Sequence, residues 1–374
     1  MGRRGSSTAR LWTALGKTAT RQARRMGREM TRALNRTLNQ TVTQPMTDAI
    51  VRNAVKQSSA VARATQRALS GVASPVPAPQ SRGSGRWEAG TAGAGPLAQR
   101  HYRIFLPAGL TARRRAPMLV LLHGCGQDAA SFAAVTRAAA SARDAGCVVL
   151  LPEQSSQANA QRCWNWFRPG TRGGAEAALL MAMIDHVCER YPVRPERVSV
   201  MGLSAGGVMA MMLGLRYPQR FVAIGSHSGA VPYSASNATQ AAAAMRGSRA
   251  PDAAARQAMR LWLAGRRLPP LLLLHGDADA VVTFDNAMTA ARLWLDLLPE
   301  PAAHLAVAPA RRVQRGQRLP AEVSDWMVAG QTCVRLVRIE GLGHAWSGGP
   351  AAQAFSDPRG PDALRIALRF FADR

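Results

Sequence analysis

The stretch that decides how this sequence folds is residues 197–207, R-V-S-V-M-G-L-S-A-G-G. The β-branched run at 198–200 predicts a short strand, and the segment that follows, to residue 215, is rich in helix-forming residues. Between them lies Gly202-Leu203-Ser204-Ala205-Gly206, a G-x-S-x-G pattern in the strand–turn–helix context of a nucleophile elbow. We therefore predict that Ser204 is a nucleophile.

Small residues on both sides of Ser204 suit a sharp turn. Such a turn holds the serine backbone in a sparsely populated conformation, and a side chain at Gly202 or Gly206 would collide with the incoming helix. The helix that starts here points free N–H groups at the site, which favours negative charge on an attacked carbonyl oxygen. The alternative is a glycine-rich turn without chemistry, because five-residue patterns also match by chance.

The chain has 374 residues and a formal net charge of +26, which by itself would indicate a phosphate-binding protein. Nearly all the basic residues are arginine, since Lys17 and Lys56 are the only lysines, and alanine is abundant. A GC-rich genome produces this composition without selection for phosphate binding. We therefore do not expect nucleic acid as a partner.

The five cysteines contain no C-x-x-C pair and no zinc-type spacing. The cysteines therefore indicate neither a metal site nor a full disulfide framework, although a single disulfide remains an open alternative. No cofactor is expected. The first thirty residues hold no apolar run of signal-peptide length, and no apolar stretch of the sequence is long enough to span a bilayer. The expected location is the cytoplasm, including association with granules. The alternative is export by a non-Sec route.

Composition divides the chain into three parts. Residues 1–72 carry 14 Lys/Arg against two acidic residues and have apolar residues at helical spacing. They are predicted to be a basic amphipathic extension that binds a granule or an anionic membrane, or alternatively a disordered tail. Residues 73–99 are rich in Pro, Gly and Ser and are predicted to be a linker. Residues 100–374 would form the catalytic domain.

Strand and helix signals alternate along the catalytic part, which predicts an α/β fold with a mainly parallel, doubly wound sheet. Apolar runs at 119–122 and 271–274 suit strands buried on both faces. A single helix is expected over 129–144. The polar, Ala-rich insertion at 233–267 is a candidate cap over the site.

A serine nucleophile needs a base and a carboxylate that orients the base. Residues 275–282, H-G-D-A-D-A-V-V, follow one apolar strand, and residues 341–346, G-L-G-H-A-W, follow a later one. We predict Asp279 as the orienting acid and His344 as the base. Asp277 is expected to be a turn residue that binds neighbouring backbone N–H groups.

The oxyanion hole should combine two backbone N–H groups. One comes from Ala205, directly after the nucleophile. The other should come from the loop L-H-G-C-G-Q at 122–127, with Cys125 as the first candidate and Gly126 as the alternative.

Six motifs together resemble the esterase family of polyhydroxybutyrate (PHB) depolymerases across about residues 100–374. They are L-H-G-C-G-Q-D, L-P-E-Q with C-W-N-W-F, R-V-S-V-M-G-L-S-A-G-G, H-S-G, H-G-D-A-D and G-L-G-H-A-W-S-G-G. The resemblance implies an α/β-hydrolase with the triad Ser204, Asp279 and His344, acting on carboxylic esters. Its implied substrate is a 3-hydroxyalkanoate polyester or oligomer. Feruloyl and acetylxylan esterases resemble the same family and are the alternative.

Trp164 and Trp346 lie in motif loops and are candidate substrate-binding residues, because flat rings can hold an acyl chain or a sugar face. The alternative is that both rings only pack these loops. A rival from another class is a protein that binds granule or membrane surfaces and carries a secondary hydrolase domain. The intact Ser, Asp and His in order argue against an inactive domain.

Overall fold

The computed structural model describes residues 85–93, 99–167, 173–298 and 305–374. All of them belong to one compact unit, Ala49–Arg374. The basic extension at 1–72 lies outside the described residues. Within the described ranges, no helix is long and apolar enough to cross a membrane.

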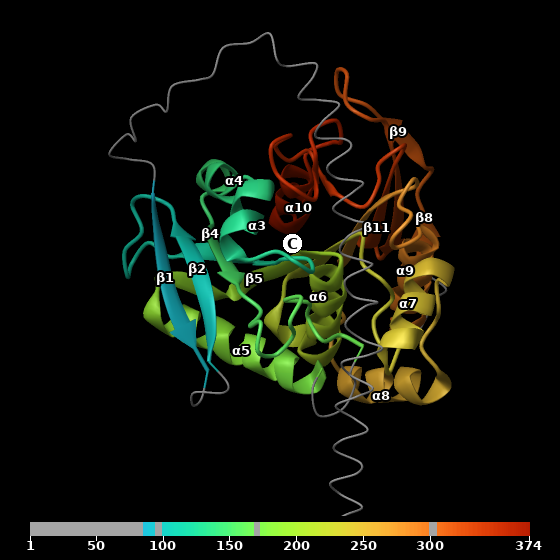
Figure 1. The fold of residues 1–374 in the computed structure, drawn as a ribbon, viewed down its shortest axis with the longest axis horizontal. Coiled ribbons are helices and arrows are strands. Elements are labelled where there is room, and N and C mark those ends of the chain that lie inside the picture. Colours follow the sequence, from blue (N-terminus) through green and yellow to red (C-terminus); the bar gives the residue numbers. More distant parts are fainter. Residues whose placement is uncertain (1–84, 94–98, 168–172, 299–304) are drawn as a thin grey trace, which may run out of the picture. The chain divides into compact units, whose positions relative to one another are not determined.

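An eleven-stranded sheet forms the centre of the described structure (Figure 1). Its strand order is β1-β2-β4-β3-β5-β6-β7-β11-β10-β8, with β9 also paired to β10. The run from β4 to β11 is parallel, and the strands at both ends of the sheet are antiparallel. The strands are β1 (Arg86–Ala92), β2 (Arg100–Leu106), β3 (Ala116–Leu122), β4 (Val148–Pro152), β5 (Val193–Leu203), β6 (Ala223–His227), β7 (Leu271–Gly276), β8 (Leu305–Val307), β9 (Arg311–Val313), β10 (Ala321–Val328) and β11 (Gln331–Ile339).

Helices cover both faces of this sheet. Figure 1 shows α3, α4 and α10 together on one face and α5 and α6 on the other, which is the doubly wound arrangement predicted from the sequence. Strands β3, β4 and β7 are buried almost throughout, as their apolar runs require. The helices are α3 (Ala129–Val135), α4 (Ala138–Ala145), α5 (Gly173–Arg190), α6 (Ala205–Arg216), α7 (Ala238–Gly247), α8 (Ala253–Leu263), α9 (Asp285–Asp296) and α10 (Ala363–Ala372).

Strand register gathers the motif loops at one edge of the sheet. Leu122 at the end of β3 pairs with Gly202, and Leu203 at the end of β5 pairs with His227. Ile339 at the end of β11 pairs with Gly276 of β7. Because these strands are parallel, the loops that follow all of them emerge at the same carboxyl edge.

The predicted linker at 73–99 is wrong in its last part. Residues Arg86–Ala92 form β1, which pairs along its whole length with β2. Trp87 packs edge-on against Phe105 at 5.2 Å, and Tyr191 donates a hydrogen bond to Glu88. Tertiary contacts therefore make a strand from a segment whose composition is typical of a linker.

The prediction of a single helix over 129–144 is also wrong, because the structure has two helices there, α3 and α4. Thr136 ends α3, and its hydroxyl donates to the carbonyl of Phe132. Arg137 then has a left-handed backbone with φ 52°, which restarts the chain in a new direction. The antiparallel strands β8, β9 and β10 were not expected at all.

The insertion at 233–267 contains α7 and α8. Helix α8 packs against α6, and α7 packs against α9. The carbonyl of Met245 accepts hydrogen bonds from the backbone of Thr283 and the side chain of Asn286. The insertion is therefore joined to the start of α9, and a role as a cap stays a prediction.

Candidate active site

Ser204 stands between β5 and α6 with φ 54° and ψ −118°. A non-glycine residue at this positive φ costs on the order of 1–3 kcal/mol, which the surrounding structure must supply. The segments around the turn pack closely. A side chain at Gly202 would collide with the backbone of Gly206, and one at Gly206 would collide with Leu122. The turn is therefore as tight as the G-x-S-x-G pattern predicts.

Asp279 and His344 meet at the same edge of the sheet. His344 Nδ1 lies 2.7 Å from Asp279 Oδ2, and both side chains are buried. Asp279 Oδ1 accepts two backbone N–H groups, from Val281 and Val282, both at 2.9 Å. Burial by itself would raise the pKa of Asp279, but the contacts with His344 and His275 outweigh it and hold this pKa well below its usual range. The carboxylate is therefore charged and fixed in orientation.

Asp277 lies nearby but faces another partner. Its carboxylate accepts the backbone N–H of Gly341 at 2.7 Å and a hydrogen bond from the side chain of Arg338 at 3.2 Å. It does bind a backbone N–H, as expected, although of a residue distant in sequence. Asp277 therefore braces the start of the loop that carries His344.

His227 connects the serine turn to the histidine loop, a role that sequence reasoning missed. Its carbonyl accepts the backbone N–H of Ser204 at 2.8 Å, and its Nε2 accepts that of Ser347 at 3.2 Å. Its ring stacks on Trp346 with centroids 5.2 Å apart. The H-S-G motif, which begins at the last residue of β6, was the available signal, because it marks a histidine at the same strand edge.

The predicted oxyanion loop follows β3. Gly124 donates its backbone N–H to the side chain of Gln127 at 2.9 Å, and Gly126 donates to the carbonyl of Gln161 at 2.7 Å. The N–H of Gly126 is thus already engaged, which favours Cys125 over the alternative. Ala205, the other candidate donor, is the first residue of α6.

A disulfide joins Cys125 to Cys163, across 38 residues of sequence. The next residue, Trp164, donates its indole N–H to the carbonyl of His123 at 2.9 Å. The segment at 163–164 therefore holds the oxyanion loop at two points. The sequence left the pairing of the cysteines open.

A buried carboxylate supports that segment in turn. Glu176, at the start of α5, accepts the backbone N–H of Asn165 at 2.7 Å and its side-chain amide at 2.5 Å. It also accepts the side-chain amide of Gln154 at 2.6 Å. The backbone N–H of Gln154 donates to His123 Nε2 at 3.1 Å. Glu176 was not singled out in the sequence, because it belongs to no recognisable motif.

Trp164 and Trp346 are each only 1% exposed. Trp164 packs against His123, and Trp346 packs between His227 and Phe132. This burial favours the alternative in which both rings pack the loops. A direct substrate contact by either ring stays a prediction.

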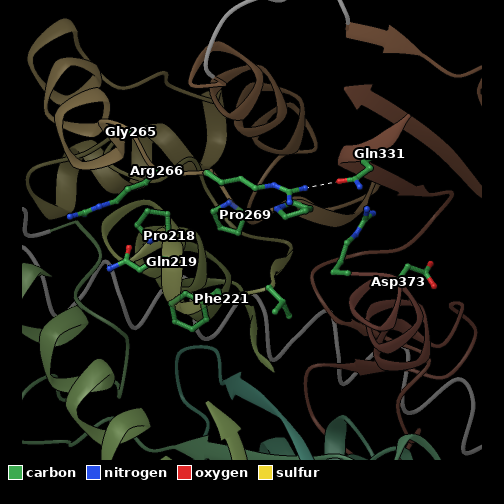
Figure 2. Close-up of a pocket in the computed structure, with 12 residues that line it drawn as sticks. Pro218, Gln219, Phe221, Gly265, Arg266, Pro269, Gln331 and Asp373 are labelled. Atoms are coloured by element: carbon green, nitrogen blue, oxygen red, sulfur yellow. Dashed lines mark hydrogen bonds between the residues drawn. The ribbon is translucent and has the colours of Figure 1, made fainter. Parts of the chain in front are cut away.

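A different pocket has a volume of about 580 Å³. Its lining includes Pro218, Pro269 and Gln331 (Figure 2). These residues lie at the amino ends of β6, β7 and β11. That is the sheet edge opposite Ser204, so this pocket is separate from the candidate active site.

The comparison with protein families agrees with this geometry. The family model described as Esterase PHB depolymerase matches residues 100–314. The chain belongs to this family. The match covers β2 to β9 and includes Ser204 and Asp279, and it ends before His344.

Individual proteins are similar to this chain over shorter stretches. Poly(3-hydroxyalkanoate) depolymerase C of Paucimonas lemoignei is 39% identical over 118 residues, which are 31% of this chain and 28% of that protein. Feruloyl esterase B of Neurospora crassa is 29% identical over 198 residues, 48% of this chain and 65% of that protein. The chain thus spans less than two thirds of the length of both relatives.

Solved structures support the fold. The acetyl xylan esterase from Aspergillus awamori superimposes with a TM-score of 0.55 at 16% identity, covering 78% of this chain and all of that one. At this identity the likeness shows the fold alone, which is the α/β-hydrolase fold predicted from the sequence.

The buried histidines of this family member predict a pH-dependent stability. Burial lowers the pKa of His123 to about 4 and that of His227 to about 3, from an ordinary value of 6.5. Below pH 6.5 these two histidines bind protons in the unfolded chain but stay neutral in the folded chain. The free energy of unfolding therefore decreases as the pH is lowered, until the pH reaches the pKa values of the folded state. Each histidine contributes a slope of up to about 1.4 kcal/mol per pH unit.

Urea unfolding at pH 7, 6 and 5 measures this slope. The variant His227→Gln should give a shallower dependence, while the same change at exposed His101 should leave the slope as it is. An unchanged slope in His227→Gln would show that His227 is not a buried neutral base.

Proposed function

We propose that this chain is a serine esterase with the triad Ser204, His344 and Asp279. The observation that carries the proposal is the 2.7 Å contact between His344 and Asp279, on loops at the same sheet edge as the strained Ser204 turn. Family membership supports carboxylic ester hydrolysis as the reaction. The order Ser, Asp, His along the chain is that of α/β-hydrolases.

In the proposed mechanism, Ser204 Oγ attacks the ester carbonyl while His344 Nε2 takes its proton. Asp279 holds the imidazole with Nδ1–H pointing at its carboxylate and stabilises the charge that forms on the ring. The backbone N–H groups of Cys125 and Ala205 donate to the oxyanion. His344 then gives the proton to the leaving alcohol, and water releases the acyl group by the same steps.

We propose 3-hydroxyalkanoate polyesters or their oligomers as the substrate, with feruloyl or acetylated carbohydrate esters as the alternative. The similarity to a poly(3-hydroxyalkanoate) depolymerase supports the first, and that to feruloyl esterases the second. The test compares kcat/KM for hydroxybutyrate oligomers, methyl ferulate, acetylated xylan and p-nitrophenyl butyrate. Preference for a carbohydrate ester would reject the first substrate, and hydrolysis of none would reject the esterase proposal.

Glu176 should matter to catalysis through the oxyanion loop. In Glu176→Gln an amide NH₂ replaces one acceptor oxygen and faces donor groups of Gln154 or Asn165, so the segment bonded to Cys125 and His123 shifts. Loss of one oxyanion donor lowers kcat by about a hundredfold to a thousandfold, and a displaced donor should cost about tenfold.

Steady-state kinetics and thermal unfolding test this role together. We expect a lower kcat at nearly unchanged KM in Glu176→Gln, and normal kinetics in Glu196→Gln, which makes the same chemical change at an exposed site. A Glu176 variant that loses thermal stability but keeps its kcat would show that the carboxylate only supports folding.

We further propose that the basic extension at 1–72 attaches the enzyme to a granule or an anionic membrane surface. A chain shortened to residues 85–374 should keep its kcat on soluble esters and lose binding to anionic vesicles and polyester granules. The shortened chain must include Arg86–Ala92, because β1 is part of the sheet. Equal binding by both forms would mean that the extension is a solvated tail.

The disulfide bears on where the enzyme works. Structural disulfides persist in oxidising compartments and are rare in the cytoplasm. The Cys125–Cys163 bond therefore supports export, the alternative to the cytoplasmic location expected from the sequence. Titration of thiols in the denatured, unreduced protein should find three, from Cys147, Cys188 and Cys333. Finding five would support the cytoplasmic location.

A further inference from the structure

A groove of about 660 Å³ lies between α10 and the antiparallel end of the sheet, where β9 and β10 join β11. Apolar side chains contribute to its lining, among them Val323, Val337 and Ile366. Seven arginines also line it. Its size falls in the range of small-molecule sites, which is about 300–1,000 Å³.

Only some of these arginines are neutralised. Arg311 and Arg335 share the carboxylate of Asp325, at 3.1 and 2.6 Å. Arg365 approaches Asp362 at 4.0 Å. Two carboxylates thus serve three guanidinium groups, which leaves this part of the groove positive.

Three further arginines add to that charge. Arg137, Arg315 and Arg369 line the groove, are exposed, and make no ion pair with any acidic residue that the structure describes. Arg137 is also the residue whose left-handed backbone separates α3 from α4. Clustered like charges repel one another, so a bound anion would be favoured here.

The apolar lining narrows the choice of anion. A compact, fully hydrated ion would leave Val323, Val337 and Ile366 without a partner. A chain with an apolar body and a carboxylate end would cover them and place its charge among the arginines, which bind carboxylates through paired N–H donors.

We propose that this groove binds the carboxylate end of an oligomeric hydroxy acid, with the chain lying along the apolar lining. The inference rests on the proposed esterase function, because cleavage of a polyester yields oligomers with a free carboxylate. The groove contains none of Ser204, Asp279 and His344, so it is a second site.

Its wall is nevertheless bonded to the candidate active site. The carbonyl of Pro361, a lining residue, accepts the hydroxyl of Ser347 at 2.6 Å. Ser347 follows His344 by three residues and donates its backbone N–H to His227. The hydrogen bond between Ser347 and Pro361 therefore links the wall of the groove to the loop that carries His344.

Isothermal titration calorimetry on the full chain carrying Ser204→Ala tests the proposal, because oligomers are not expected to be cleaved there. The probes are the 3-hydroxybutyrate trimer as the free acid, its neutral methyl ester, and inorganic phosphate. We expect the acid to bind about tenfold more tightly than the ester, since the ester has no charge for the arginines. Phosphate should bind more weakly than the acid.

A charge-matched pair of variants locates the binding. Arg315→Gln with Arg369→Gln should remove the preference for the acid, while Arg113→Gln with Arg249→Gln, at exposed positions outside the groove, should retain it. Equal binding of acid and ester by the parent would overturn the proposal, as would phosphate binding as tightly as the trimer. Hydrolysis of p-nitrophenyl butyrate with Ser204 intact tests the esterase function separately.

Discussion

Replacing Ser204 with alanine is expected to lower kcat for soluble esters by about a thousandfold or more, because no other described hydroxyl stands at this turn. The change removes a single oxygen from a half-buried side chain. The alanine keeps the same positive φ, so the strain of the turn and the close contact between Gly202 and Gly206 are retained. We therefore expect thermal unfolding within a few degrees of the parent protein.

Two measurements make this result decisive. A fluorophosphonate probe should label the parent protein at Ser204 and leave the variant unlabelled. Ser228→Ala, in the neighbouring H-S-G motif, is the matched control and should retain activity. More than a few per cent of the parent kcat in Ser204→Ala would reject Ser204 as the nucleophile.

The second large effect is expected at Asp279. Asparagine would keep an oxygen for the N–H groups of Val281 and Val282 but would turn an amide NH₂ towards His344 Nδ1. The imidazole would then hold its proton on the wrong nitrogen and could not accept one from Ser204. The same substitution in a serine protease lowers kcat about ten-thousandfold, and we expect a loss of that order.

Asp277→Asn provides the control for this experiment. Its carboxylate bonds to Gly341 and Arg338 and does not face the imidazole, so we expect at most about a tenfold loss from a shifted loop. If Asp277→Asn were the more damaging change, the orienting carboxylate would be Asp277 in the active conformation. Both variants should be compared by kcat at the pH optimum of the parent protein.

The parts of the site that lie at strand ends could be predicted from the sequence. The loops that follow parallel strands lie at one edge of the sheet. A predicted strand followed by a short polar motif was therefore enough to predict that Asp279 and His344 lie close together. Residues that act through packing carry no such signal. His227 and Glu176 were missed because their partners, Trp346 and Asn165, become neighbours only in the folded chain.

The errors in the fold have a similar cause. Strand β1 ends in Ala89-Gly90-Thr91-Ala92, a composition that resembles the linker before it, and only the pairing with β2 shows that it is a strand. The break at Arg137 is set by its backbone angle and by the capping of α3, neither of which a hydrophobic pattern records. The disulfide could not be assigned, because five cysteines allow many pairings.

The close packing around Ser204 also limits how this sequence can change over time. A side chain at Gly202, Gly206 or Gly276 would strike the backbone of another segment, so these positions offer no room for variation. Under the proposed esterase function, adaptation to a new ester must then come from side chains outside these packed turns. The glycines that hold the backbone around Ser204 can therefore stay constant while the side chains that select the substrate vary.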